Sequence, residues 1–420
     1  MKAGAIEKFI MHLHPKKVST QSIKFTRTFG LGGINALLFV ILAFTGILLR
    51  FSYVPTVAGA YDSIIYLQEE VLFGQWLRNI HHYAAHLMVI TSFLHLVRVY
   101  YSHSFYRKRA KNWIYGMILF VLVLFFNFTG YLLPWDQLAF WAVTVMTQVV
   151  EYIPFVGPYL ADAVRGGDTI NEHTLLNFYN LHTSVLPIAI IVFMSMHFWL
   201  VRSAGGVATP TKVPRTMVDC RQTLVPREAL VAMIVIAGLM LVSALFNAPL
   251  EGQANPAVSP NPNKAPWYFL GAQELLLHLN PIFSAFIIPM LVSVLFFILP
   301  YFKYDKINTG VWYHSPRGKV LVLESSIFAF IFTFALILLL DFAVRPSAAI
   351  AALPYWLGGG IIPMLLYFIP FVGFIFYQNK KEKLEVAELV QIVVTVILVS
   401  YIVMMLTSQF LRGEGMKLFA

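Results

Sequence analysis

The sequence has little sulfur and little charge. It holds one cysteine, Cys220, and only 12% of its 420 residues are Asp, Glu, Lys or Arg. One cysteine excludes an intramolecular disulfide and an iron–sulfur cluster held by this chain alone. The Cys-x-x-Cys-His motif that attaches c-type haem is absent as well. Hydrophobic residues make up 59% of the chain, so the sequence predicts an integral membrane protein.

Apolar runs of membrane-spanning length recur along the whole chain. We predict an all-α, polytopic membrane protein with nine transmembrane helices. These spans cover roughly residues 30–50, 79–101, 113–133, 180–202, 228–248, 282–302, 320–341, 358–378 and 387–410.

The basic residues lie mostly in alternate loops. The net charge is +10, and 23 of the 30 lysines and arginines fall on the side of the amino terminus. The positive-inside rule then places the amino terminus in the cytoplasm and the carboxyl terminus outside. The first residues, from Lys2 to Arg27, form a basic amphipathic stretch without the pattern of a cleavable signal peptide. We therefore expect a bacterial inner membrane protein that binds the lipid bilayer and no nucleic acid.

The spans divide into two groups. Residues 1–202 are expected to form a four-helix bundle, and residues 203–227 a basic cytoplasmic linker. Residues 228–420 are expected to form a second membrane domain of about five helices, with a long outer loop over residues 249–281.

Two pairs of histidines share a nearly equal spacing. His81 precedes His95 by 14 residues, and His182 precedes His197 by 15. Four helical turns separate the members of each pair, which places them on one helix face, about 21–23 Å apart along the axis. Because both spans run inward, we expect an outer couple, His81 with His182, and an inner couple, His95 with His197. Each couple offers two axial imidazoles to one non-covalent b-type haem iron.

Other histidines and other roles compete with this interpretation. His82 and His86 lie off the face that carries His95. A single intramembrane histidine is as compatible with a hydrogen bond between helices, whereas two matched pairs favour haem.

Small and basic residues repeat the histidine pattern. Two glycine pairs are each 14 residues apart, a spacing that lets a flat macrocycle approach the backbone at two depths, although small residues also serve ordinary helix packing. These glycines are Gly32, Gly46, Gly116 and Gly130. Arg78 and Arg98 each lie three residues from a histidine, near the two interfaces. They are candidates for haem propionate binding, or interfacial arginines that extend to the headgroups.

Four motifs make the chain resemble cytochrome b of the quinol–cytochrome c oxidoreductases, the cytochrome bc complexes. They are Arg78–His81, Thr129–Gln137, Phe178–His182 and Ala265–Phe269. The 15-residue interval and the Leu-Pro-Trp-Asp-Gln run are similar to the chloroplast-type branch, in which the two halves are separate chains. The resemblance implies a low-potential outer haem, a high-potential inner haem, an outer quinol oxidation pocket and an inner quinone reduction pocket. It also implies a Rieske-type iron–sulfur protein, a c-type cytochrome and a dimeric complex as partners.

The outer quinol pocket departs from the family pattern. Family members usually have Pro-Glu-Trp-Tyr, whereas Pro266 occupies the glutamate position here. Quinol oxidation releases two protons, so an acceptor must stand nearby. Our substitute is Glu274, with Asp136 as a second candidate. The remaining residues expected at this pocket are Tyr131, Trp267 and Tyr268.

Two rival functions remain open from the sequence. One is a dihaem membrane anchor of a quinone-linked dehydrogenase or reductase, with a single quinone site. The other is a proton-coupled transporter whose histidines relay protons, which predicts no haem and more carboxylates within the spans. The aromatic outer loop and the scarcity of such carboxylates favour the bc-type cytochrome.

Overall fold

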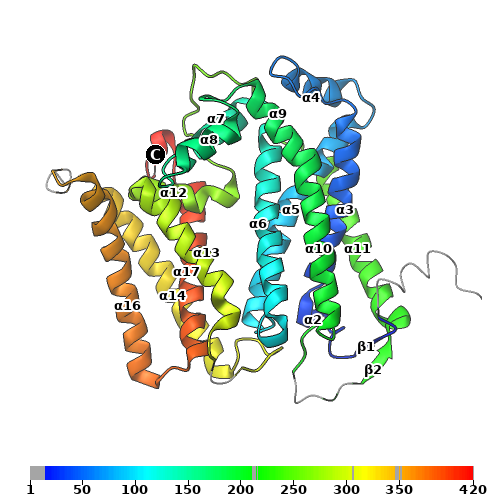
Figure 1. Ribbon diagram of the computed structural model, residues 1–420, viewed down its shortest axis with the longest axis vertical. Coiled ribbons are helices and arrows are strands. Elements are labelled where there is room, and N and C mark those ends of the chain that lie inside the picture. The colour runs from blue at the N-terminus through cyan, green and yellow to red at the C-terminus, as the bar shows by residue number, and fades with distance from the viewer. Residues whose placement is uncertain are drawn as a thin grey trace, which may run out of the picture. The chain divides into compact units, whose positions relative to one another are not determined.

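The computed structural model describes residues 15–210, 214, 216–304, 307–345, 350 and 352–419. These residues are mostly helical (Figure 1). A short antiparallel pair joins β1 (Lys17–Ser19) to β2 (Met217–Asp219), with Lys17 opposite Asp219. The predicted all-α class is confirmed. Residues 1–14 of the predicted amphipathic stretch lie outside the described part of the chain.

Within the described residues, nine helical segments are long and apolar enough to cross a membrane, which confirms the predicted number. Several consist of an α-helix continued by a π-helical turn. They contain α3 (Leu31–Arg50), α5 (Gly74–Tyr101), α6 (Ala110–Leu132), α9 (Glu172–Asn180) with η2 (Leu181–Val185) and α10 (Leu186–Ser203), α11 (Cys220–Leu245), η4 (Ile282–Ile287) with α13 (Ile288–Ile298), α14 (Pro316–Leu339) with η6 (Leu340–Val344), η7 (Leu357–Ile361) with α16 (Ile362–Glu382), and α17 (Val386–Phe410).

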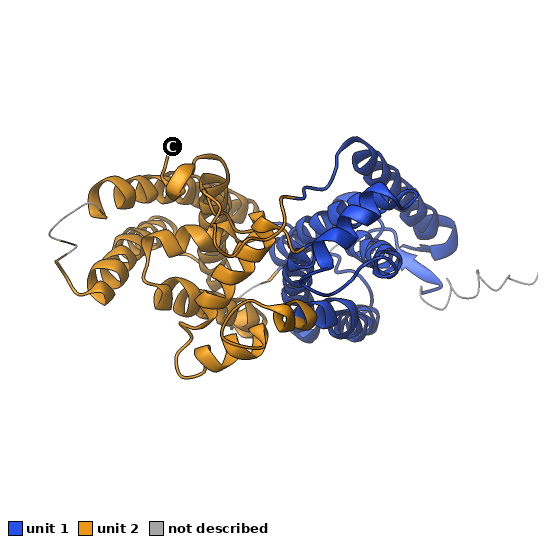
Figure 2. Ribbon diagram, turned by 90° about the horizontal axis from the view of Figure 1, so that it is seen from above, with its two compact units in different colours: residues 1–134, 178–250, 308–312 blue, residues 135–177, 251–307, 313–420 orange. Residues whose placement is uncertain are grey.

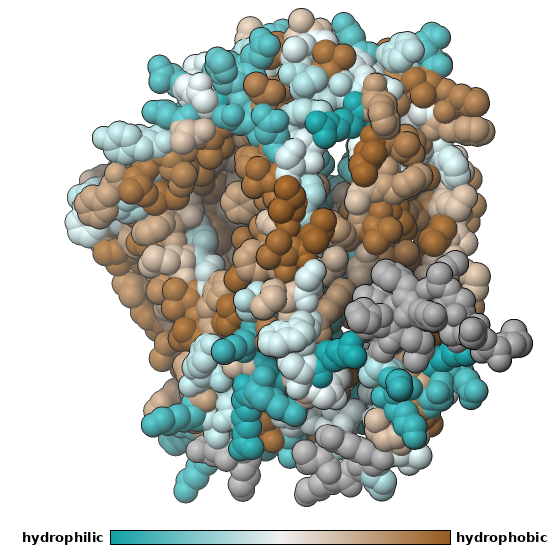
Figure 3. Space-filling view, turned by 45° about the vertical axis from the view of Figure 1, so that its right-hand side comes forward, coloured by the Kyte–Doolittle hydropathy of each residue, from teal (hydrophilic) through white to brown (hydrophobic). Residues whose placement is uncertain are grey.

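The sides of these helices carry exposed apolar residues. Phe44 on α3, Ile188 on α10 and Phe376 on α16 are each more than 60% exposed. On the face drawn in Figure 3, hydrophobic residues cover the middle of the spans and hydrophilic residues gather at both ends. A soluble protein would bury such surfaces, so these helices face lipid and the chain is a multi-pass membrane protein.

Contacts divide the chain into two compact units, coloured separately in Figure 2. Unit 1 comprises residues 1–134, 178–250 and 308–312, and unit 2 comprises residues 135–177, 251–307 and 313–420. Because α11 packs against α5 and α3, it belongs to unit 1. That the chain consists of two domains joined by a linker over residues 203–227 stays a prediction.

Unit 1 contains two tightly packed helix pairs. α3 packs along α5, α6 packs along α10, and α5 also contacts α6. Shorter helices flank these pairs. They are α2 (Phe25–Thr28), α4 (Ala60–Glu69) and η1 (Arg107–Arg109).

Unit 2 is built around α14 and α17. Its core contains Leu321 and Ala329 from α14 and Ile392 and Val396 from α17, all buried. The short α12 (Leu270–His278) packs on α17. The other short elements of unit 2 are α7 (Gln137–Val150), α8 (Gly157–Arg165), η3 (Trp267–Phe269), η5 (Leu299–Tyr301) and η8 (Glu414–Met416).

Several helices begin earlier than the hydropathy predicts. α11 starts at Cys220 rather than near residue 228, and α14 at Pro316 rather than near 320. Their first turns are polar, so hydropathy does not detect them, but capping side chains fix their starts. The carboxylate of Asp219 accepts from the backbone N–H of Gln222 at 3.1 Å, and Ser315 Oγ accepts from Gly318 at 2.9 Å.

Candidate functional site

The outer couple lies inside unit 1. His81 is in the second turn of α5, and His182 is in η2, the π-helical turn between α9 and α10. Their ring centres are 6.2 Å apart and the ring planes are inclined by 68°. The structure therefore brings the two predicted outer histidines ring to ring. π-helical turns are uncommon and often occur at functional sites.

Hydrogen bonds fix which nitrogen of each outer imidazole carries the proton. The Nδ1 of His182 lies 3.0 Å from the carbonyl oxygen of Phe126, which can only accept, so this Nδ1 donates. The Nδ1 of His81 lies 2.8 Å from Thr45 Oγ1, whose own proton goes to the carbonyl of Ile41. In both neutral imidazoles the Nε2 is then unprotonated, the state that a metal ligand requires.

The inner couple has the same spacing. The ring centres of His95 on α5 and His197 on α10 are 6.5 Å apart, with planes inclined by 73°. The 14 residues between His81 and His95 along α5 separate the two couples by about 21 Å. Unit 1 thus contains two imidazole couples at two depths.

Each of the four glycines lies against one of the four histidines. A Cβ on Gly46 would lie 3.2 Å from His81 Cε1, and one on Gly130 would lie 2.5 Å from His182 Cε1. On the inner level, a Cβ on Gly32 or on Gly116 would lie 3.4 Å from the Cε1 of His95 or of His197. α3 therefore backs the histidines of α5, and α6 backs those of α10. The glycines make room for the ligand ring itself.

The distances within the couples suit an iron between two imidazoles. A metal–imidazole nitrogen bond is about 2 Å long and the ring centre lies roughly 1 Å beyond the nitrogen, so two axial rings have centres ~6 Å apart. The observed 6.2 and 6.5 Å match this separation. Buried, unprotonated Nε2 atoms on the outer rings are the donors that haem iron uses. The residues present fit two b-type haems.

The competing histidines have different partners. The Nε2 atoms of His82 and His86 lie 3.1 Å from each other, one turn apart on α5. Among the contacts of the described residues, these two rings pair with one another, and the couples contain the four histidines predicted as ligands.

The two arginines predicted for propionates are both buried and bonded to protein oxygens. Arg78 donates to the carbonyls of Ala248 and Pro249, at 2.8 and 2.7 Å. Arg98 Nε donates to the carbonyl of Arg27 at 2.5 Å. These contacts occupy some of the N–H donors of each guanidinium. The role of the two arginines in binding propionates stays a prediction.

The residues predicted for the outer quinol pocket have several local roles. Tyr131, half-buried in the last turn of α6, belongs to unit 1, and the other four belong to unit 2. Asp136 caps α7 by accepting from Ala139 N–H at 2.9 Å. Trp267 and Tyr268 stack edge to face in η3, where the Tyr268 carbonyl accepts from the hydroxyl of Tyr401.

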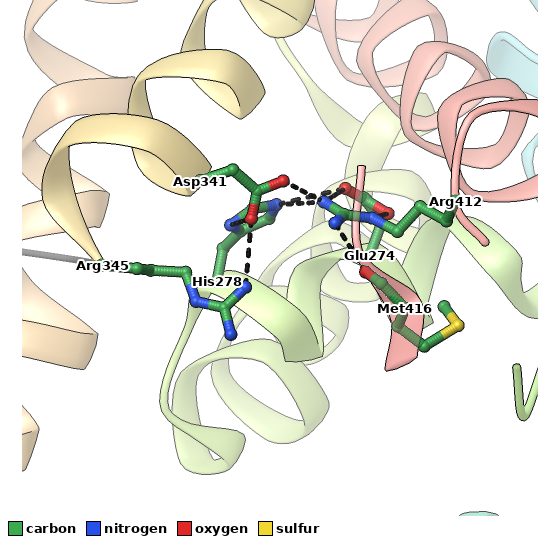
Figure 4. A network of polar contacts seen from close by, with 6 residues as sticks. All are labelled: Glu274, His278, Asp341, Arg345, Arg412 and Met416. Atoms are coloured by element: carbon green, nitrogen blue, oxygen red, sulfur yellow. Dashed lines mark hydrogen bonds and ion pairs between the residues drawn. The ribbon is translucent and has the colours of Figure 1, made fainter. Parts of the chain in front are cut away.

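Glu274 lies in a buried ion cluster of unit 2 (Figure 4). Arg412, from the segment after α17, donates to both of its carboxylate oxygens, through Nε at 2.8 Å and through Nη2 at 2.5 Å. The same Nη2 donates to Asp341 of η6 at 2.7 Å, and His278 Nε2 lies 3.1 Å from Glu274. Asp341 also accepts from Arg345, whose side chain is half exposed.

Opposing effects act on the carboxyl of Glu274. Burial raises its pKa, but the hydrogen bonds from Arg412 and His278 and the charge of Arg412 outweigh burial, so the pKa is lowered. Burial lowers the pKa of Arg412, and its bonds to Glu274 and Asp341 raise it above its ordinary value. Both groups are therefore held in their charged forms.

Sequence reasoning missed the partners of both sites. Thr45 and Thr129 each directly precede a glycine that lies against a histidine, so a repeated Thr-Gly pair could have pointed to them. The partnership of Arg412 with Glu274 spans 138 residues. A local pattern cannot reveal such a contact. The only signal in the sequence was that Arg412 and Asp341 follow or end two spans on the same predicted side of the membrane.

The chain is similar in sequence to proteins of known family. The family model described as "Cytochrome b/b6/petB" matches residues 16–205. The chain is 45% identical to cytochrome b6 of Tupiella akineta over 175 residues, which are 42% of this chain and 81% of that protein. It is 42% identical to cytochrome b6 of Prochlorococcus marinus (strain MIT 9515) over 175 residues, which are 42% of this chain and 80% of that protein.

One solved structure matches nearly the whole chain. It is a chain of a "Hyperthermophilic respiratory Complex III", superimposed with a TM-score of 0.69 over 96% of this chain and 97% of that one. The sequence identity is 22%, so this likeness concerns the fold.

Proposed function

Because the chain belongs to the cytochrome b/b6 family, we propose that it holds two b-type haems and passes electrons from quinol at the outer face to quinone at the inner face. The observation that carries this proposal is the pair of imidazole couples, with ring centres 6.2 and 6.5 Å apart at two depths of unit 1. In this role the chain is the cytochrome b subunit of a bc-type quinol–cytochrome c oxidoreductase.

The four histidines would hold the two irons, and the four glycines would leave room for the ligand rings. When bound, haem supplies reversible one-electron reduction of its iron. The chain supplies the separation of the two sites, the orientation of the rings and an apolar surrounding. The bonds from His81 and His182 to Thr45 Oγ1 and to the carbonyl of Phe126 hold the outer rings in the ligating tautomer.

The outer quinol site is proposed to use residues of the outer loops and of the helix end that precedes the first of them. Glu274, Asp136, Tyr131, Trp267 and Tyr268 are its candidate residues. Glu274 is buried beside His278, Asp341 and Arg412, so its ion cluster offers a proton-accepting group shielded from bulk water. Protons released there would leave on the outer side, and charge separation would follow from electron transfer across the membrane.

The partners follow from the same proposal. An electron acceptor of high potential must lie outside this chain, which has no cysteine set for an iron–sulfur cluster. We propose a Rieske-type iron–sulfur protein and a c-type cytochrome, in a dimeric complex of a bacterial inner membrane with the amino terminus in the cytoplasm. The fold shared with a complex III chain and the basic residues on one side support this arrangement.

Steady-state turnover tests the proposal. The purified complex should reduce a c-type cytochrome with quinol, and His197→Leu, which removes one inner ligand, should abolish sustained turnover. His173→Leu, at an exposed position on α9, is the control and should keep the wild-type rate. Unchanged turnover in His197→Leu, or no quinol-dependent reduction by the intact complex, would overturn the proposed function.

A further inference from the structure

The ion cluster around Glu274 contains one group whose protons can be assigned by counting. The Nη2 of Arg412 has two N–H protons but three neighbours at hydrogen-bond distance. They are Glu274 Oε1 at 2.5 Å, Asp341 Oδ2 at 2.7 Å and His278 Nε2 at 3.1 Å. The two carboxylate contacts are the shorter and charge-assisted, so they take both protons.

The count assigns the proton on His278. No proton of Nη2 remains for His278 Nε2, whose other neighbour, Glu274 Oε1 at 3.1 Å, can only accept. The Nε2 therefore carries its own proton and donates it to Glu274. In the neutral ring, the Nδ1 is then an unprotonated acceptor.

This Nδ1 is buried, and among the described residues it has no hydrogen-bond partner. It lies 4.0 Å from Asp341 Oδ1, so two acceptors face each other with no proton between them. A proton added to Nδ1 would gain this carboxylate as its partner and would leave Nε2 bonded to Glu274. Nδ1 of His278 is thus the atom of the cluster that can bind one more proton.

The charges favour the same place. With His278 neutral, the carboxylates of Glu274 and Asp341 balance the guanidiniums of Arg412 and Arg345. The added proton would create an imidazolium with two carboxylates and one guanidinium, that of Arg412, as its charged neighbours, so the negative neighbours outnumber the positive one. Glu274 is the poorer acceptor because Arg412 binds both of its oxygens and would lose two charge-assisted hydrogen bonds on its protonation.

Exposure increases along the cluster. The side chain of Glu274 is 0% exposed, that of His278 5%, that of Asp341 9% and that of Arg345 51%. A proton on His278 therefore lies between a fully buried carboxylate and a slightly exposed one, which is paired with the half-exposed Arg345. Asp341 is the neighbour from which the proton can reach solvent.

We propose that His278 is the proton acceptor of the outer quinol site, with Asp341 as the next carrier and Glu274 and Arg412 as fixed charges that position it. This inference rests on the proposed function and refines it, because it transfers the accepting role from Glu274 to its neighbour. Oxidation of quinol breaks two O–H bonds and releases two electrons. One hydrogen leaves as a proton and an electron to the proposed iron–sulfur protein. The other O–H bond breaks as an N–H bond forms at Nδ1 of His278, and the second electron leaves towards the inner quinone site. The N–H bond then breaks as the proton passes to Asp341 and to water.

The test uses the purified complex and a matched pair of variants. His278→Gln removes the proposed acceptor. The control, His314→Gln, removes another histidine of unit 2. Its side chain is also 5% exposed and lies near a carboxylate, that of Glu385. His314 precedes the first residue of α14, whereas Asp341 follows the last residue of that helix. Haem spectra of both variants establish that the complex is assembled.

His278→Gln should lower kcat about 100-fold, with KM nearly unchanged, because the step loses its proton acceptor. It should also change the dependence of kcat on pH, which a purely structural role would leave as in the wild type. His314→Gln should keep the wild-type kcat and its pH dependence. Glu274→Gln should keep the wild-type form of the pH dependence, because the acceptor is still present.

A second measurement does not depend on activity. Infrared pH-difference spectra with isotope-labelled histidine should show an imidazole protonation signal that His278→Gln lacks and His314→Gln keeps. The same signal in His278→Gln, or a pH–rate profile equal to the wild type, would overturn the inference. A wild-type complex that keeps this signal but does not oxidise quinol would refute the proposed function and leave His278 as a buried proton store.

Discussion

The outer and inner histidine couples share one ring spacing but differ in how their rings are held. In the outer couple, His182 donates from Nδ1 to the carbonyl of Phe126, and His81 donates from Nδ1 to Thr45 Oγ1. In the inner couple, the buried Nδ1 of His95 has no hydrogen-bond partner within the described part of the chain. The same ligand type is therefore placed in two electrostatic environments.

The difference begins in the sequence. Threonine precedes the glycine on the outer level, as Thr45-Gly46 and Thr129-Gly130, whereas Leu31 and Tyr115 precede the inner glycines. The glycines leave space for the imidazole ring. The residue before each glycine determines whether a hydroxyl group lies within hydrogen-bond distance of the ring's Nδ1. A hydrogen bond at Nδ1 makes an imidazole a stronger electron donor, which stabilises oxidised iron. The outer site should thus have the lower reduction potential.

Loss of a ligand is the largest change and tests whether the couples are independent. His81→Leu should remove the outer haem and His95→Leu the inner one, each reducing the haem content from two per chain to one or to none. His173→Leu, at an exposed position, should keep both. Optical spectra with haem quantification measure the result. An unchanged haem content in both ligand variants would show that these rings do not hold iron.

A methyl group on a glycine should affect the outer level more than the inner. A Cβ at position 130 would lie 2.5 Å from His182 Cε1, a distance at which the ring must move, whereas at position 116 it would lie 3.4 Å from His197 Cε1. Gly130→Ala should therefore weaken haem retention about tenfold or more, by displacing a ligand held by Phe126. Gly116→Ala, the matched control, should remain close to the wild type. Equal losses from the two variants would remove the steric contrast between the levels.

The smallest effect comes from the hydroxyl that bonds to His81. Thr45→Val keeps the shape of the side chain and removes the acceptor, so the midpoint potential of the outer haem should rise while that of the inner haem stays constant. Thr91→Val removes another buried threonine hydroxyl, on α5, which bonds to Asn35 instead of to a histidine. This control should leave both potentials unchanged. Potentiometric titration measures both midpoint potentials. Equal shifts in the two variants would contradict the proposed effect of the Thr45 hydroxyl on the outer haem.

Local patterns predicted much of this molecule. The nine spans could be predicted from apolar runs, because a helix that crosses a bilayer must be apolar over its length. The histidine spacing of 14 and 15 residues places the members of each pair on one helix face. The polar first turns of α11 and α14 were missed because hydropathy detects the apolar part of a helix, not its cap. The ion pair of Glu274 with Arg412 joins residues far apart in the chain, and only the packing of α12 on α17 brings them together.

Haem stoichiometry is the measurement that decides whether one chain holds two haems between four histidines. The chain should be purified in detergent and quantified as pyridine haemochrome, with a dithionite-minus-ferricyanide spectrum. We expect two non-covalent b-type haems per chain, resolved as two components in a redox titration. A well-folded preparation with one haem or none would contradict it.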